Sequence, residues 1–351
     1  MNSRYKFLLV VLLLHLPLYA YPILRLSQWL DLSAIVTAVI FVPLFFSQII
    51  ARVYLRHANS GAVFWLRRIA DLWLGISPLL LCALLLAEIP VALELIAPSV
   101  AAICLISLSL TLTLYSVVNA YSPSIVEVQL TSPKLKSPLR FVQITDVHIG
   151  SRSSGFLQRV MRKVNSLDAD FLCITGDFID ATGIAEEQLE ALRECPIPIY
   201  FSIGNHERYE DLDAILERLE RLGVRVLRTE AEVKDGVQVI GIDDSDHPLQ
   251  VERELRRLEI DTNLFVLLLY HRPRGHESAA AAGVDLMISG HTHNGQIVPF
   301  NFVVGRVFEK IVGLFKEGAT HLYVSPGTGT WGPIMRLGSR GEVTSFVVQP
   351  E

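Results

Sequence analysis

The sequence predicts an α/β domain that follows an N-terminal region of four transmembrane helices. The chain is 51% hydrophobic with a mean hydropathy of +0.40, and its long uncharged runs lie before Ser122. From Leu139 onward, short apolar runs alternate with amphipathic segments, which is the pattern of strands and covering helices. Several of these apolar runs end in clusters of Asp, Asn and His, which indicates a polar site at the strand ends.

Four apolar segments of membrane-spanning length open the chain. They cover residues 7–24, 32–51, 69–87 and 95–118, and a helix needs ~20 residues to cross ~30 Å of hydrocarbon. One such segment could be a buried helix of a soluble domain, and the first could be a signal peptide. Four in succession with short loops favour a multi-pass membrane region over residues 1–121.

Basic residues around these segments predict their orientation. Two precede the first segment and four lie between the second and the third, whereas the loop between the third and fourth has acidic residues and no base. The basic residues are Arg4, Lys6, Arg52, Arg56, Arg67 and Arg68. Because basic loops stay in the cytoplasm, both termini, and with them the region that follows the fourth segment, are expected on the cytoplasmic side of the membrane.

Charge and cysteine content exclude two other classes of protein. The net charge of −5 argues against a general nucleic-acid binder. The four cysteines are scattered and have neither a disulfide-framework nor a zinc-site spacing.

Residues 122–138 contain three prolines and predict a linker with a short strand over 125–130. The domain at 139–351 predicts further strands over 140–145, 170–175, 198–203, 237–242, 264–270 and 285–289. Helices are expected between them over 155–167, 186–194, 211–222, 249–258 and 275–282. Such alternation is typical of an α/β domain in which helices cover the sheet.

The polar clusters at the strand ends predict a metal site. Their members are Asp146, His148, Asp177, Asn205, His206, His271, His291 and His293. Because ligands of open α/β sheets bind at the carboxyl ends of the strands, these side chains are expected to converge. Carboxylate, amide and imidazole groups suit Mn²⁺, Fe²⁺ or Zn²⁺, and even seven ligands from these eight residues exceed what one four-coordinate ion uses. Two divalent ions sharing a carboxylate are therefore expected.

These clusters form five blocks in the order D-x-H, G-D, G-N-H, a lone H and G-H-x-H. In order and residue type they resemble the calcineurin-like metallophosphoesterase superfamily, over roughly residues 139–348. The resemblance implies a metallophosphoesterase β-sandwich flanked by helices and a metal-dependent phosphoric ester hydrolase.

The resemblance also implies roles for the individual residues. One metal would be held by Asp146, His148 and His293, a second by Asn205, His271 and His291, and Asp177 would bridge the two. A hydroxide between the metals would be the nucleophile. His206 would face the phosphate, where it would protonate the leaving oxygen or stabilise transition-state charge.

Residues beside the blocks have weaker assignments. Asp180 is expected to cap or orient a neighbouring group, and Glu207, where the family often has Asp, is expected to hold the His206 imidazole. Asn294 and Gln296 follow the last block closely enough to touch substrate, although loop polarity alone would also explain them.

Three further segments have open interpretations. The acidic turn with Asp243, Asp244 and Asp246 is expected to be solvated, with a substrate-facing role as the alternative. The tail resembles a subgroup of bacterial membrane-anchored phosphoesterases, but its spacing before Arg336 departs from the pattern, which leaves a phosphate-binding role there open. The apolar residues 300–315 predict either a strand–helix hairpin on the core or a membrane-surface helix that could form one wall of an acyl-chain groove.

Together these features predict a membrane-anchored dinuclear-metal phosphoesterase acting on a phosphorylated small-molecule or lipid-linked substrate. Membrane-associated relatives hydrolyse the pyrophosphate of UDP-2,3-diacylglucosamine, which is a plausible substrate that the motifs do not themselves select. The alternatives are an anchored nucleotide or protein phosphatase and a catalytically silent membrane sensor. A complete ligand set speaks against the sensor.

Overall fold

The computed structural model describes residues 15–51 and 61–351. Within it the chain divides into two compact units. One unit contains the chain up to Val118 together with Gly332–Met335, and the other contains Asn119–Trp331 and Arg336–Glu351. The domain limits expected at residues 121 and 138 stay a prediction.

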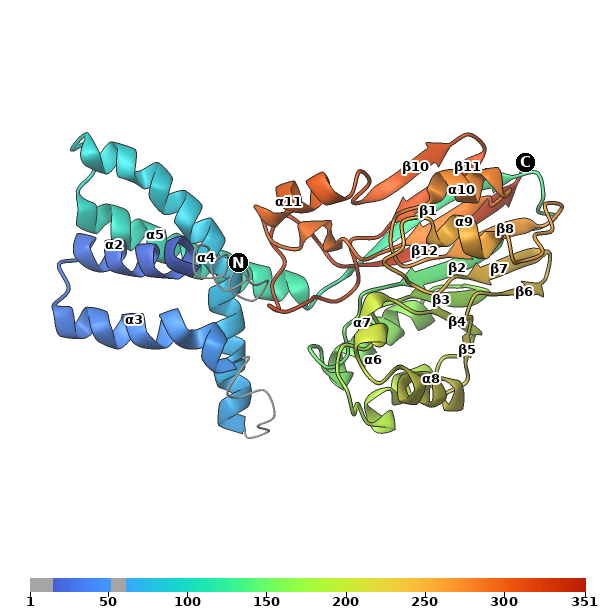
Figure 1. The fold of residues 1–351 in the computed structure, drawn as a ribbon, viewed down its shortest axis with the longest axis horizontal. Helices are drawn as coiled ribbons and strands as arrows, with labels where there is room; N and C mark the ends of the chain where they lie inside the picture. Colours follow the sequence, from blue (N-terminus) through green and yellow to red (C-terminus); the bar gives the residue numbers. More distant parts are fainter. Residues whose placement is uncertain (1–14, 52–60) are drawn as a thin grey trace, which may run out of the picture. The chain divides into compact units, whose positions relative to one another are not determined.

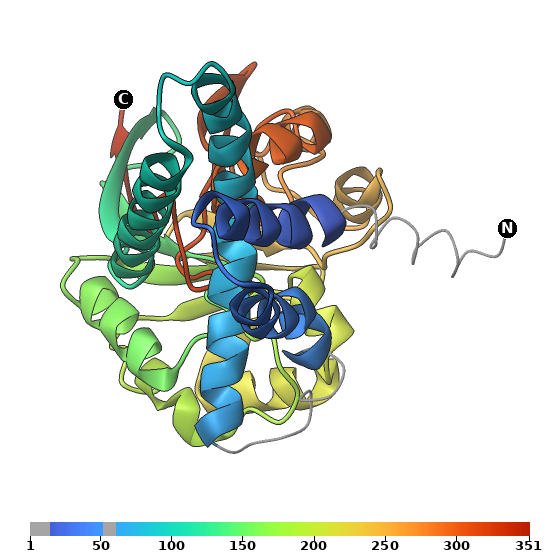
Figure 2. The same ribbon diagram turned by 90° about the vertical axis from the view of Figure 1, so that its left-hand side faces the viewer.

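The first unit consists of helices. A π-helical turn, η1 (Leu16–Ala20), leads into α2 (Tyr21–Trp29), which is followed by α3 (Ala34–Ile49), α4 (Gly61–Ala92) and α5 (Pro98–Ala120). The long α4 packs against α2 and α3 (Figure 2). Leu26 and Trp29 of α2 join Leu80 and Leu84 of α4 in a small apolar core, so α2 and α4 are held by side-chain packing.

Two helices of the first unit are long and apolar enough to cross a membrane. Trp65–Ala92 and Pro98–Ala120 each have a mean hydropathy of 2.1. Apolar side chains along α3 and α5 are exposed, for example Ile35 at 79% and Leu114 at 68%, which is unusual for a surface that faces water. These features indicate membrane association.

Four spans are not confirmed. The apolar helix α3 has 16 residues, which is shorter than the ~20 that a span needs. Residues 7–14 of the first expected span lie outside the described residues.

Two six-stranded mixed sheets form the second unit (Figure 1). In spatial order the first contains β1 (Ser124–Ser132), β12 (Glu342–Pro350), β2 (Leu139–Ile144), β3 (Phe171–Thr175), β4 (Ile199–Ser202) and β5 (Val224–Val226). The second contains β10 (Gly313–Glu317), β11 (Thr320–Val324), β9 (Leu286–Ser289), β8 (Phe265–Leu269), β7 (Val237–Gly241) and β6 (Glu230–Lys234). Strands β2 to β5 run parallel, as do β7, β8 and β9, so their carboxyl ends share one edge within each sheet.

The helices of this unit are α6 (Ser154–Asn165), α7 (Asn205–Tyr209), α8 (Leu212–Arg221), α9 (Gln250–Leu255), α10 (His276–Ala281) and α11 (Phe300–Val307). Short 3₁₀ turns lie at η3 (Glu186–Gln188), η4 (Glu190–Leu192) and η5 (His293–Gly295). Helices α6 and α8 cover the outer face of the first sheet, and α9 and α10 cover that of the second.

Strand alternation builds the core between the sheets. In β2, Phe141 points toward the second sheet and stacks on Phe346 with ring centroids 4.7 Å apart, whereas Val142 and Ile144 point to the opposite face, under α6. Because successive residues of a strand face opposite sides, each central strand contributes to two apolar layers. The predicted α/β sandwich flanked by helices is thereby confirmed for the second unit.

The sequence prediction missed five strands, β5, β6, β10, β11 and β12, and the helix expected at 186–194 consists of the two 3₁₀ turns η3 and η4. β5 has three residues and β6 and β10 lie at sheet edges. Short or edge strands form because a neighbour pairs with them, and their own pattern carries little signal.

Candidate metal centre

The carboxyl ends of five strands bring the predicted metal-binding side chains together. β2, β3 and β4 of the first sheet lead into the blocks of Asp146, Asp177 and Asn205. β8 and β9 of the second sheet lead into those of His271 and His291. The two sheets therefore contribute different halves of one site.

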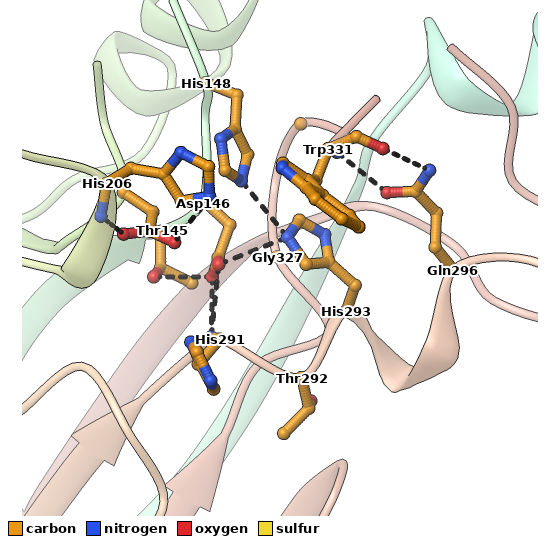
Figure 3. Close-up of polar contacts among 12 residues, drawn as sticks. Thr145, Asp146, His148, His206, His291, Thr292, His293, Gln296, Gly327 and Trp331 are labelled. Atoms are coloured by element: carbon orange, nitrogen blue, oxygen red, sulfur yellow. Dashed lines mark hydrogen bonds and ion pairs between the residues drawn. The ribbon is translucent and has the colours of Figure 1, made fainter. Parts of the chain in front are cut away.

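A first group contains Asp146, His148 and His293, whose ligand atoms all lie within 4.8 Å of one another. The Nε2 atoms of the two histidines are 3.2 Å apart, and that of His293 is 3.3 Å from Oδ1 of Asp146. The Asp146 carboxylate accepts hydrogen bonds from the backbone N–H of His291 at 3.0 Å and from the Thr145 hydroxyl at 2.8 Å (Figure 3). The side chain of Asp146 is therefore fixed before any ion binds.

A second group contains Asp177, His271 and His291, again within 4.8 Å. Nε2 of His271 lies 3.1 Å from Oδ2 of Asp177 and 3.1 Å from Nδ1 of His291. Nδ1 of His271 lies 2.8 Å from the carbonyl oxygen of Thr175. Donation from Nδ1 to this carbonyl leaves Nε2 as the nitrogen that can bind a metal once its proton has been released.

These side chains fit divalent ions. Two pairs of imidazole nitrogens face each other at 3.2 and 3.1 Å, and neutral rings whose lone pairs meet repel unless a proton or a cation lies between them. Oδ1 of Asn205 is buried and has no hydrogen-bond partner among the described residues, which is unfavourable for an amide oxygen. A bound cation would satisfy both. The seven metal ligands nevertheless stay a prediction.

Backbone strain is concentrated at the same place. Of the eleven non-glycine residues with positive φ in the described chain, seven belong to the site loops. They are Asp146, His148, Asp177, His291, His293, Asn294 and Gln296. Left-handed conformations cost of order 1–3 kcal/mol each for such residues and persist where the surroundings enforce them. The fold thus stores strain in the loops that aim the predicted ligands.

Two glycines in the blocks allow close approach between loops. A Cβ at Gly290 would collide with the side chains of Asp146 and Thr145, and one at Gly204 would collide with the carboxylate of Asp177. Because only glycine lacks this atom, the G-N-H and G-H-x-H loops can pack directly on the carboxylates.

Glu207 does not hold His206 as expected. Its buried carboxylate instead accepts hydrogen bonds from four backbone N–H groups, those of Asp177, Phe178, Ile179 and Gly204, at 2.7 to 3.0 Å. Burial and the nearby Asp177 raise the pKa of Glu207 to about 7, while the backbone donors oppose that rise. Glu207 therefore ties the G-D loop to the G-N-H loop. The prediction was wrong because residue spacing does not reveal the direction of a side chain.

Asp180 and His206 complete the rim of the site. Oδ2 of Asp180 lies 3.3 Å from Nδ1 of His148, so Asp180 can orient that ring. The backbone N–H of His206 donates to Oδ1 of Asp177 at 2.8 Å, and its ring Nε2 lies 4.0 Å from Oδ2 of the same residue. His206 thus lies beside both groups, and with His148 and Asp180 it forms a third cluster whose ligand atoms lie within 4.8 Å of one another.

Two side chains in the loops that follow the blocks have structural partners. The Gln296 amide is bonded to the backbone of Trp331, with its Nε2 donating at 3.0 Å and its Oε1 accepting at 2.8 Å (Figure 3). Arg336 is fully buried and donates to the carbonyl oxygens of Gly327 and Gly329 at 3.0 and 2.7 Å. Arg336 therefore holds the tail loop instead of offering its charge to a phosphate.

Asp244 is a further departure from the sequence analysis. It was expected on a solvated turn, but it is 4% exposed and accepts hydrogen bonds from Arg208 at 2.7 Å and Arg272 at 2.6 Å. Arg272 directly follows His271. The acidic turn therefore anchors the two arginines that flank the site, and only long-range contacts reveal this.

Burial and charge together set the protonation of the metal-free site. Burial alone would lower the pKa of His271, but the carboxylates of Asp177 and Asp146 outweigh it and raise that pKa to about 10. His271 and other imidazoles in turn overcome the effect of burial on Asp177 and hold its pKa well below the usual range. Burial lowers the pKa of His291 and His293 well below that of free histidine. The metal-free protein therefore carries a proton on His271 that a metal must displace.

This proton predicts that metal affinity rises with pH. The folded-state pKa of His271 is raised, so its proton is held throughout the neutral range and must be released on binding, whereas Asp177 is already ionised. Mn²⁺ affinity, measured by calorimetry on the full chain, is expected to increase at least about tenfold per pH unit between pH 6 and 8, because the pKa of His148 is also raised, the effect of burial being outweighed by that of Asp180. The exposed His247→Gln variant should keep this slope, and an affinity that is independent of pH would contradict the assignment.

Comparisons with known proteins agree with this geometry. The family model for calcineurin-like phosphoesterases matches residues 139–295. An uncharacterized metallophosphoesterase of Aquifex aeolicus is 33% identical over 250 residues, which cover 67% of this chain and 95% of that protein. An uncharacterized metallophosphoesterase of Campylobacter jejuni is 32% identical over 251 residues, which cover 68% of this chain and 67% of that protein.

The name of a third relative describes it as a transmembrane protein. A transmembrane protein with a metallophosphoesterase domain from Danio rerio is 32% identical over 273 residues, covering 68% of this chain and 60% of that protein. The match therefore spans less than two thirds of that relative. With the fold and the five strand-end blocks, these matches establish that the chain belongs to the calcineurin-like metallophosphoesterase family.

Proposed function

We propose that this protein is a membrane-anchored phosphoesterase that hydrolyses a phosphoester or pyrophosphate bond with two divalent metal ions. The supporting observation is the pair of side-chain groups, one around Asp146 and one around Asp177, at the shared edge of two sheets. In this proposal residues 1–121 form the membrane region, 122–138 the linker and 139–351 the catalytic domain.

The proposed roles follow from the positions of the side chains. Asp146, His148 and His293 would hold one ion, Asn205, His271 and His291 the other, and Asp177 both. Two such ions, of Mn²⁺, Fe²⁺ or Zn²⁺ type, supply Lewis-acid charge to phosphoryl oxygens and lower the pKa of water. The ring of His206 lies beside Asp177, and burial lowers its pKa, so at neutral pH it would donate an N–H hydrogen bond from a neutral imidazole to a phosphate oxygen.

The proposal predicts metal-dependent phosphodiesterase activity. The detergent-purified chain should hydrolyse bis(p-nitrophenyl) phosphate after Mn²⁺ is restored to the metal-stripped protein, and Asp177→Asn should lower kcat at least about a hundredfold because a neutral amide cannot supply the negative charge that both metals would share. His206→Gln should retain metal and lower kcat about a hundredfold or more.

Asp235→Asn, the same exchange on an exposed turn, serves as the control and should be as active as the wild type. A metal-loaded wild type without turnover would contradict the proposal and favour a sensor. Turnover that survives Asp177→Asn would instead move the chemistry away from this site.

We further propose that the substrate is lipid-linked, as UDP-2,3-diacylglucosamine is. Helix α11 begins five residues after the end of η5, the turn that carries His293. On α11, Phe302, Val303 and Val307 are 69%, 58% and 61% exposed. Water-exposed apolar side chains in such a row fit acyl chains or a membrane surface, which supports the second of the two interpretations of residues 300–315.

This substrate proposal predicts a selective effect of polar substitutions on α11. Val303→Ser should raise KM for micellar UDP-2,3-diacylglucosamine about fivefold and leave KM for bis(p-nitrophenyl) phosphate unchanged, because an apolar contact is lost. Val233→Ser on β6 is a matched control, since Val233 is 57% exposed. Equal KM values for both variants, or no hydrolysis of the lipid, would favour an anchored nucleotide or protein phosphatase.

We also propose that the catalytic domain lies in the cytoplasm, at a bacterial inner membrane. The excess of arginine between the second and third apolar segments supports this orientation. A fluorescent-protein fusion at the C-terminus should fluoresce, and an alkaline phosphatase fusion there should be inactive in cells. The reverse pattern would place the domain outside the cytoplasm and overturn the orientation.

A further inference from the structure

His206 lies against two exposed aromatic side chains. The ring centroid of Tyr209 is 5.9 Å from that of His206, and the ring centroid of Trp331 is 6.3 Å away. The two aromatic residues are 63% and 59% exposed. Large aromatic side chains are usually well buried, so two that stand open beside one functional histidine require an explanation.

Trp331 is held in position from behind. The Gln296 amide makes two hydrogen bonds to the backbone of Trp331 (Figure 3), and the backbone N–H of Gln296 donates to the carbonyl oxygen of His293 at 2.9 Å. Gln296 itself has a φ of 59°, a conformation that is uncommon for a residue with a side chain. A residue with a strained backbone thus links Trp331 to the loop that carries the predicted metal ligand His293.

Tyr209 is also fixed close to predicted site residues. It ends α7, the short helix that begins with Asn205 and contains His206. The N-terminus of α7 is fixed by the hydrogen bonds that the backbone N–H groups of Gly204 and Asp177 donate to the Glu207 carboxylate. Tyr209 lies on the same short helix as two predicted site residues, and Trp331 is hydrogen-bonded to the loop of a third. The hydrogen bonds that position the predicted site residues therefore also position the two aromatic rings.

We propose that Tyr209 and Trp331 form a subsite for the leaving group of the substrate, and that this leaving group presents a ring face next to the phosphoester oxygen. A nucleoside or a sugar has such a face. In the proposed phosphoesterase, on which this inference rests, His206 contacts the phosphate, and the group beyond the ester oxygen meets the two aromatic rings. Aromatic side chains bind flat or C–H-rich ring faces well and small polar groups poorly. Gln296 is a positioning residue for Trp331.

Binding to the metal-loaded full chain in detergent tests this subsite without requiring turnover. Dissociation constants are measured by calorimetry for uridine 5′-monophosphate, glucose 1-phosphate, ethyl phosphate and inorganic phosphate. In the wild type at least one ring-bearing ester should bind more tightly than ethyl phosphate. Trp331→Ala should raise the dissociation constant of that ester about tenfold and leave that of inorganic phosphate unchanged, because one stacking face is lost. The two ring-bearing esters distinguish a nucleoside from a sugar.

Further variants separate this role from a structural one. Trp331→Phe should keep most of the preference for ring-bearing esters, and Tyr209→Ala should lose part of it. Gln296→Ala should raise the dissociation constants of ring-bearing esters only, because Trp331 loses the side chain that holds its backbone. Leu249→Ala, at a site that is 53% exposed, is the control and should bind all four ligands as the wild type does.

Two results would overturn the inference. If Trp331→Ala weakens the binding of inorganic phosphate as much as that of ring-bearing esters, Trp331 only supports the loop that carries the predicted metal ligands. If the wild type binds inorganic phosphate but binds the ring-bearing esters no more tightly than ethyl phosphate, the subsite is refuted and the proposed phosphoesterase is left intact. A metal-loaded wild type that binds none of the four ligands would count against both.

Discussion

The site depends on the burial of two carboxylates at one place. Asp146 and Asp177 are 0% and 2% exposed, and buried anions are unfavourable without compensating positive charge. In the metal-free protein the protonated His271 supplies part of that charge, and its raised pKa reflects this demand. The remaining positive charge would come from metal ions, which explains why neutral imidazoles and an amide oxygen without a hydrogen bond surround the same point.

Neither sheet alone carries the full set of predicted ligands. The loops after the strands of the first sheet contain Asp146, His148, Asp177 and Asn205, and those after the strands of the second contain His271, His291 and His293. The apolar layer between the sheets fixes their relative position, since close-packed side chains allow little sliding. Local bonds then set the fine geometry, as in the attachment of two loops to Glu207 and the approach of Gly290 to Asp146. A mutation deep in the layer between the sheets would therefore act on the site as directly as a mutation in a loop.

The sequence predicted what depends on local spacing. Apolar runs that alternate with amphipathic segments correctly predicted the α/β sandwich and the five strands that lead into the site, but they missed the inner strands β11 and β12. The clusters at the strand ends indicated which residues converge. The errors concern side chains whose partners are distant in sequence. Glu207 was expected to contact its neighbour His206, but its carboxylate accepts hydrogen bonds from backbone N–H groups of two loops. Asp244 was expected in solvent, but it is buried and paired with two arginines. No periodicity encodes these partners.

Hydropathy gave a similarly partial answer in the N-terminal region. It identified apolar segments, but whether a segment is long enough to cross a bilayer depends on where its helix starts and stops. α3 ends at Ile49 after 16 residues, whereas α4 extends well beyond its predicted limits. The sequence also did not indicate that Trp331 is exposed beside His206, because the two residues are far apart in the chain.

The central claim is that this edge of the sandwich holds two metal ions, and counting them tests it most directly. The full chain would be stripped, loaded with Mn²⁺, freed of excess metal by gel filtration and analysed for metal and protein content. Two ions per chain in the wild type, with a loss of metal in Asp177→Asn, are the expected result, because one carboxylate serves both positions. A ratio of one or less that Asp177→Asn leaves unchanged would contradict the account.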